Sequence, residues 1–205
     1  IDMGSTGLKA VAFDSGSGAS LAVAGDALAH QRSSGGGCEL TADGIRDALM
    51  QALRSIADQL GEQRVRQVSA IGCTGHGAGL YALDAKGQLL RGLAVASTDQ
   101  RASHRAAQLA EQHGAALYEE VGCQPWSGQP TQVLAELVAR GAVEASQIQH
   151  LLFAKDYLTW LLTGTLATDA GGQSGELQGL QPGRKGGMQS VHSHIDHTSH
   201  QVCMV

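Results

Sequence analysis

The chain opens with Ile1-Asp2-Met3-Gly4-Ser5-Thr6-Gly7-Leu8-Lys9-Ala10, and this stretch decides its fold. An acidic residue stands at the end of a short apolar strand, small residues follow in a tight turn, and a second apolar strand begins at once. Because the turn carries no bulky side chains, its backbone N–H groups can approach an anion closely. The Asp2 carboxylate can hold Mg²⁺, usually through water, against the same anion. The stretch therefore predicts a cradle for a metal-bound phosphate group.

Two common nucleotide-binding loops are excluded for this segment. The sequence lacks the G-x-x-x-x-G-K-[ST] pattern of a P-loop, and the turn leads into a strand where a Rossmann fingerprint leads into a helix. Taken by itself, the segment also fits a plain glycine hairpin with a solvated Asp2, and this alternative stays open at this point.

Working outward, the next segments predict hairpins followed by alternating helices and strands. Apolar runs at 8–13 and 19–23 flank turn residues and predict an antiparallel hairpin. Thr41 is expected to cap an amphipathic helix that ends at Gly61. The other expected elements are strands at 68–73, 80–83 and 151–154, a turn at 84–87, and helices at 101–112 (ending at Gly114), 131–140 and 156–163. This order predicts an α/β fold, a mixed sheet with antiparallel hairpins flanked by helices.

The composition excludes several classes of protein and partner. Of 205 residues, 42% are hydrophobic and 16% are charged, which is a globular balance. A net charge of −5 with 14 Lys and Arg leaves no basic stripe, so nucleic acid is not an expected partner. No apolar run approaches the roughly 20 residues of a membrane helix, so a membrane is not expected either. Four cysteines without a C-x-x-C pair predict neither zinc nor disulfides and fit a reducing, cytoplasmic setting.

Four blocks of the sequence, taken in order, resemble the motifs of the FGGY carbohydrate kinases. Residues 1–10 resemble the family's first phosphate motif, G-I-D-x-G-T-T/S-x-x-K. Residues 71–84 (IGCTGHGAGLYALD) resemble its strand, substrate loop and hairpin, I-G-I-S-G-Q-x-x-G-L-x-x-L-D. Residues 97–101 (STDQR) resemble W/S-x-D-x-R, and residues 155–164 (KDYLTWLLTG) resemble K-D-Y-L-x-x-x-L-T-G, with Thr168-Asp169 after it. One block alone would not suffice, but four in order at these spacings carry the resemblance.

The resemblance implies the actin-like, ribonuclease H-like ATPase architecture, in which two similar lobes close over ATP and sugar. This chain would hold most of the first lobe. By resemblance, Asp2 would bind Mg²⁺, and Gly4, Ser5 and Thr6 would contact the phosphates of ATP.

On the sugar side, the resemblance implies that Asp99 accepts hydrogen bonds from sugar hydroxyls, with Arg101 supporting it or the adjoining loop. His76, Gly77 and Ala78 stand where family members place substrate-facing residues. Ala78 departs from the family pattern because His or Lys is common there. The departure removes a polar contact and leaves the exact sugar open.

Three of these substrate positions also have purely structural interpretations. Asp99 fits an N-cap for the helix expected near Arg101. His76 fits a surface histidine in a glycine loop. Trp126, within Gln124-Pro125-Trp126-Ser127-Gly128, fits either a core residue or an aromatic that stacks on a sugar. The order of the motifs favours the sugar site for Asp99, and we also favour a site role for His76 and Trp126.

The chain is expected to be a fragment with a foreign tail. Residues 1–181 are predicted to form an incomplete lobe, and 182–205 an irregular His-rich tail outside the fold. Four tail histidines suggest a metal site, but no regular element is predicted to fix their geometry, and a frameshifted tail is the favoured interpretation. These are His192, His194, His197 and His200. Since the chain begins at Ile1, at what resembles the end of a strand, its N-terminus is also expected to be incomplete.

The predicted function follows from what the family motifs supply and what they lack. The family's catalytic base, an Asp in a later Gly-Asp motif, and its second lobe have no counterpart in this sequence. We therefore predict a fragment of an ATP-dependent kinase for a ketopentose or related polyol, similar to L-xylulose, that is inactive alone and whose parent could be a homodimer. A non-catalytic sugar-binding or regulatory lobe is the alternative. An actin-like assembly module is disfavoured by the Asp99 and Arg101 block.

Overall fold

The computed structural model describes residues 1–168, so the predicted tail at 182–205 lies outside the described residues. Its strands are β1 (Asp2–Met3), β2 (Gly7–Phe13), β3 (Ser20–Ala27), β4 (Gln31–Arg32), β5 (Cys38–Thr41), β6 (Thr74–Gly75), β7 (Tyr81–Leu83), β8 (Leu93–Val95) and β9 (His150–Leu152). Its helices are α1 (Ala42–Val65), α2 (Ser103–Val121), α3 (Pro130–Ala139) and α4 (Ala154–Thr163), with 3-10 turns at Leu90–Gly92 and Ala145–Gln147.

The first sheet is mixed, as the sequence predicts, and its order is β3-β2-β1-β6. β2 and β3 form the predicted antiparallel hairpin, whose turn is held by hydrogen bonds from the Ser17 N–H and hydroxyl to Asp14 Oδ1. β1 pairs antiparallel with β2 and parallel with β6, so Asp2 stands between Lys9 and Thr74. A strand of only two residues therefore joins the hairpin to the rest of the lobe.

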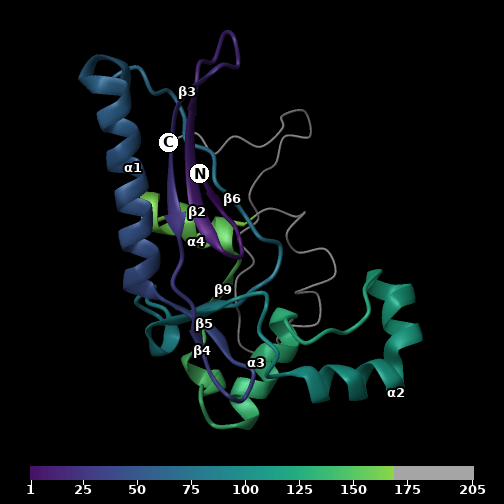
Figure 1. Cartoon of the computed structure of the whole chain (residues 1–205). Helices are drawn as coiled ribbons and strands as arrows, with labels where there is room; N and C mark the ends of the chain where they lie inside the picture. The colour runs from purple at the N-terminus through teal and green to yellow at the C-terminus, as the bar shows by residue number, and fades with distance from the viewer. Residues whose placement is uncertain (169–205) are drawn as a thin grey trace.

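Helix α1 covers one face of the hairpin and builds the main core. The Thr41 hydroxyl accepts a hydrogen bond from the Gly44 N–H at 3.0 Å, which confirms the predicted cap. Ile45 and Leu49 recur at helical spacing on the buried face and pack in one cluster with Leu8 of β2. Figure 1 shows α1 lying along the hairpin, while α2 and α3 lie at the opposite end from the hairpin turn.

Two smaller sheets and the remaining helices complete the lobe. Their orders are β4-β5-β8 and β7-β9. Val133 and Leu137 of α3 pack with Leu80 and Val95 in a second buried cluster. α4 packs beside β1 and β6, and Gly164 in the left-handed conformation ends it, as predicted.

The predicted strand at 68–73 is wrong. Residues 66–73 form no strand, and Val68 is 51% exposed. The ladder begins only where β1 supplies partners, since the Thr74 N–H donates to Ile1 O and the register continues from Asp2 opposite Thr74. Among the described residues, no strand pairs with residues 66–73, so their apolar pattern alone does not make them a strand.

The predicted end of α2 at Gly114 is also wrong, because the helix continues to Val121 and ends at a left-handed Gly122. A glycine inside a helix costs only about 1 kcal/mol relative to Ala, which tertiary packing readily offsets. Gly114 is buried against the Gln124 side chain, whose Oε1 lies 2.6 Å from where a Cβ would stand. Within residues 1–168, no helix combines the length and apolar character that crossing a bilayer demands.

Candidate functional site

The site is built at the edge where β1 and β6 end. Because the two strands run parallel, the segments that follow them leave the sheet on the same side. The turn Gly4–Thr6 follows β1, and His76 follows β6. The His76 N–H donates to Met3 O at 3.0 Å, so the predicted phosphate turn and the predicted substrate loop are adjacent.

The turn after β1 offers one carboxylate and two amides. Asp2 is exposed, and its Oδ2 lies 4.0 Å from where a Cβ on Gly4 would stand, so the carboxylate faces the turn. The Gly4 N–H donates to Gly7 O at 2.9 Å and closes the turn, so this amide is already used. Among the described residues, no group accepts a hydrogen bond from the backbone N–H of Ser5 or Thr6.

These groups fit a magnesium-bound phosphate. Mg²⁺ is commonly held by one or two carboxylates together with substrate phosphates and water. In the part of the chain that the structure describes, no three His, Cys, Asp or Glu side chains gather as a protein-only metal site. A single exposed carboxylate beside two available amides matches the shared mode of binding, in which the phosphate supplies the other ligands.

His76 is packed into its loop by a glycine. Its Cε1 lies 2.6 Å from where a Cβ on Gly79 would stand, and Gly79 has a φ of +114°, so only glycine fits there. Its Nε2 lies 3.3 Å from the Tyr81 hydroxyl, and its Nδ1 is buried without a hydrogen-bond partner. Burial lowers the pKa of His76, while the Ala78 backbone and, to a smaller extent, the nearby charge of Asp2 oppose that shift. Burial also raises the pKa of Tyr81.

His30 is a residue of this site that the sequence did not point to. Its Nδ1 lies 2.9 Å from Leu28 O, and the Leu28 N–H donates to Thr6 O at 3.0 Å. The ring therefore lies near the phosphate turn, and a charge on it lowers the pKa of His76. Its Nε2 is buried without a hydrogen-bond partner. No motif or spacing marks this position, since it becomes part of the site only through folding of β3 and β4.

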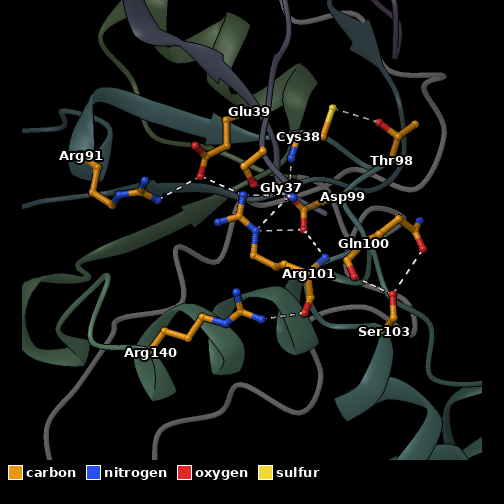
Figure 2. Close-up of polar contacts among 11 residues, drawn as sticks. Gly37, Cys38, Glu39, Arg91, Thr98, Asp99, Gln100, Arg101, Ser103 and Arg140 are labelled. Carbon is orange, nitrogen blue, oxygen red and sulfur yellow. Dashed lines mark hydrogen bonds and ion pairs between the residues drawn. The ribbon is translucent and has the colours of Figure 1, made fainter. Parts of the chain in front are cut away.

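Asp99 is fully buried in a network of charges, shown in Figure 2. Its Oδ1 accepts from the Arg101 backbone N–H and Nε at 2.9 Å, and its Oδ2 accepts from Arg101 Nη2 at 2.8 Å. The Cys38 N–H also donates to Oδ2, at 2.7 Å. Glu39 Oε1 accepts from Arg101 Nη2 at 2.8 Å and from Arg91 Nη1 at 3.0 Å. Two carboxylates and two guanidinium groups thus tie β5 to the 97–101 segment.

The network bears on two expectations for Asp99. Its carboxylate is 0% exposed and already accepts from Arg101 and Cys38, and a direct contact with a sugar hydroxyl stays a prediction. The alternative of a helix cap is wrong, because the N-cap of α2 is Ala102 and no side chain caps it. Burial disfavours the charged form of Arg101, but the hydrogen bonds and charges of Asp99 and Glu39 outweigh that cost and raise its pKa.

The other predicted substrate residues divide between exposed and buried. Gly77 is exposed, whereas Ala78 is only 6% exposed, so its methyl group is not open to a ligand here. Trp126 is half-buried, and its Cζ3 lies 2.4 Å from where a Cβ on Gly128 would stand. That same Cβ position lies 2.1 Å from Ser97 O, so glycine lets the Trp126 loop pack on the segment that precedes Asp99.

The structure joins most of the predicted residues through one loop. His76 adjoins the phosphate turn at Met3, while Leu80, four residues later, exchanges hydrogen bonds with Val95 at 2.9 Å in both directions. Val95 leads directly into the segment that holds Asp99. Backbone hydrogen bonds therefore connect the phosphate turn to the glycine loop, and the glycine loop to the strand that leads into the 97–101 segment.

Two members of the charge network, Glu39 and Arg91, were missed from the sequence. Glu39 lies between buried Cys38 and Leu40, and a lone acid in a short apolar strand is a weak signal for an ion pair. Arg91 carries a left-handed φ of +60°, which no sequence pattern reveals.

Comparisons with known proteins identify the family and the fold of this chain. The family model described as "FGGY family of carbohydrate kinases, N-terminal domain" matches residues 1–177. A xylulose kinase of Streptomyces coelicolor is 32% identical over 177 residues, covering 85% of this chain and 35% of that protein. The xylulose kinase structure from Rhodospirillum rubrum aligns with a TM-score of 0.75 at 21% identity, over 85% of this chain and 36% of that one. The structure of Plasmodium falciparum glycerol kinase with ADP aligns with a TM-score of 0.64 at 11% identity, over 84% of this chain and 39% of that one.

The fold is that of an actin-like ATPase lobe, as the sequence predicts. The chain belongs to the FGGY family of carbohydrate kinases, whose N-terminal domain it matches over residues 1–177. It spans about a third of the length of the relatives that it matches.

Replacing Arg101→Ala is expected to destabilise the lobe by about 3–5 kcal/mol, because Asp99 would be left as a buried charge without its partner. Urea unfolding of the purified chain measures the change. Arg46→Ala is the matched control, since Arg46 pairs with Asp43 on an exposed helix face and its loss should leave the unfolding midpoint unchanged. Equal effects of the two substitutions would contradict a structural role for the network.

A second expectation concerns pH. Because the pKa of His76 is lowered in the fold, the unfolded chain binds more protons than the folded one below about pH 6.5, and stability should fall on acidification. His76→Gln should therefore flatten the decline in unfolding free energy between about pH 7.5 and 5.5. His104→Gln, at an exposed position of α2, should not alter it. Parallel curves for the parent chain and His76→Gln would show that His76 is not the buried group responsible.

Proposed function

We propose that the chain is the first lobe of an ATP-dependent kinase that phosphorylates a ketopentose or related polyol similar to L-xylulose. One observation carries the proposal. The parallel pair of β1 and β6 sets the Asp2 turn directly beside the His76 loop, through the bond from the His76 N–H to Met3 O. Phosphoryl transfer to a hydroxyl group requires a phosphate-binding turn beside a substrate-binding loop.

On the nucleotide side, the proposed ligands are groups that can still form hydrogen bonds or bind a metal ion. The Asp2 carboxylate would hold Mg²⁺, and the N–H groups of Ser5 and Thr6 would bind phosphate oxygens, with Gly4 closing the turn beneath them. The bound metal ion would neutralise charge on the phosphates. These groups lie at the partly exposed edge where β1 and β6 end, so a nucleotide can reach them without rearrangement of the core.

On the sugar side, the proposed contacts come from His76, Gly77 and Trp126, which keep exposed surface. Asp99 and Arg101 would act indirectly, since they hold the 97–101 segment against β5 and so position the loop on which Trp126 packs. The buried methyl group of Ala78 offers no polar contact, which leaves room for more than one small polyol. The Streptomyces coelicolor relative is described as a xylulose kinase, and this supports a ketopentose.

We further propose that this chain alone does not complete the reaction. Phosphoryl transfer requires a base to accept the proton of the attacking hydroxyl, and the resemblance implies that the family carries this base in a later Gly-Asp motif, which has no counterpart in this sequence. The cytoplasmic location stays a prediction from the sequence, and within the described residues Cys38, Cys73 and Cys123 form no disulfide.

Asp2→Asn should weaken binding of magnesium-ADP to the purified chain about tenfold, the effect of losing one charge-assisted contact of ~1.4 kcal/mol. Isothermal titration calorimetry measures the affinity, and ADP without Mg²⁺ provides the reference. Asp58→Asn, on the exposed face of α1, is the control that should bind like the parent chain. If Asp2→Asn and Asp58→Asn bind magnesium-ADP equally well, the assignment of the metal ligand is wrong.

Titration with D-xylulose, L-xylulose, xylitol and glycerol tests the substrate class. We expect a ketopentose or its polyol to bind, His76→Ala to weaken that binding, and a coupled assay with magnesium-ATP to show no turnover. Turnover by the chain would contradict the proposed incompleteness. Sugar binding without any magnesium-ADP binding would instead identify a sugar-binding or regulatory lobe.

A further inference from the structure

Strand β3 is the outer strand of the first sheet and carries an open edge. In the order β3-β2-β1-β6, β3 pairs with β2 and, within residues 1–168, with no other strand. An edge strand presents N–H and C=O groups that can pair with a strand of another chain. Proteins usually block such edges with Lys, Pro or covering segments, yet Ser20–Ala27 contains neither Lys nor Pro, and its one charged residue is Asp26.

A single side chain from α1 occupies this edge. The Val23 N–H donates to Gln59 Oε1 at 3.3 Å, and Gln59 Nε2 donates to Val23 O at 3.0 Å. A hydrogen-bonded pair in an antiparallel sheet exchanges the same two bonds between opposite residues. The Gln59 amide therefore takes the place that a residue of a neighbouring strand would take. Its Nε2 also lies 3.2 Å from Ser55 Oγ, one turn earlier on α1, which holds the amide in this orientation.

The edge is self-complementary when two copies are related by a twofold axis at Val23. In that antiparallel register, Val23 faces Val23 of the second copy and Asp26 faces Ser20, so no like charges stand opposite each other. Exposed apolar side chains accompany the edge, since Val23 is 49%, Leu21 39% and the neighbouring Phe13 64% exposed. Pairing would cover part of this apolar surface. A bulge between Ala12 and Phe13 limits the regular part of the edge to the residues around Val23.

We infer that the β3 edge is a self-association surface for a second copy of this chain, and that Gln59 keeps it closed. The inference does not depend on the proposed kinase activity, because the edge lies on the hairpin, away from the segments that follow β1 and β6. Removing the amide frees both backbone groups of Val23 and vacates the space beside them.

Gln59→Ala tests the inference in the full 205-residue chain. Sedimentation velocity over a range of protein concentrations should show association at least about tenfold tighter than that of the parent chain. Gln51→Ala is the matched control, since Gln51 is an exposed glutamine of the same helix with no bond to β3, and it should behave like the parent. Circular dichroism and thermal unfolding confirm that each variant is folded.

Two double variants identify the surface. Gln59→Ala with Val23→Pro lacks the N–H that pairing requires, and Gln59→Ala with Val23→Lys sets like charges opposite each other, so both should return to the state of the parent chain. Equal association of Gln59→Ala and the parent, or association that survives both changes at Val23, would overturn the inference. So would a parent chain that already associates and loses that association through Val23→Lys alone.

Discussion

The parallel pairing of β1 with β6 is the interaction on which the rest of the lobe depends. β1 has two residues, yet it joins the hairpin on one side and the glycine loop on the other. Its Met3 is fully buried in the main core, while the Met3 carbonyl accepts from His76. Core and site are therefore held by the same residue, and the position of the phosphate turn relative to the substrate loop is set by backbone bonds.

The second constraint is the charge network around Asp99. A fully buried carboxylate is tolerated because Arg101 and the Cys38 amide satisfy both of its oxygens. Asp99, whose motif suggests contact with a ligand, thus connects strand β5 to the segment before α2. Its influence on a sugar would pass through the placement of the Trp126 loop, which packs on Ser97.

Much of the fold was predictable because local signals agreed with tertiary packing. Thr41 as a cap, the 8–13 and 19–23 hairpin, and Gly164 as a helix end were all confirmed. The prediction of a strand at 68–73 was wrong because an apolar run needs a neighbouring strand. The prediction that α2 ends at Gly114 was wrong because packing against Gln124 outweighs the small cost of a glycine inside a helix. Glu39 and Gln59 could not be predicted, since each gains its role from a partner that is distant in sequence. His30 could not be predicted either, since it approaches the turn at Thr6 only through the bond from the Leu28 N–H to Thr6 O.

The contact between His76 and Gly79 links two positions that a sequence comparison would treat separately. The imidazole fills the volume that any side chain at position 79 would need. A relative with a larger residue at 79 must therefore direct residue 76 elsewhere, and a relative with a shorter residue at 76 leaves a gap above the glycine. Replacements at positions 76 and 79 should consequently occur in pairs, so that the residue at one position cannot be interpreted without the residue at the other.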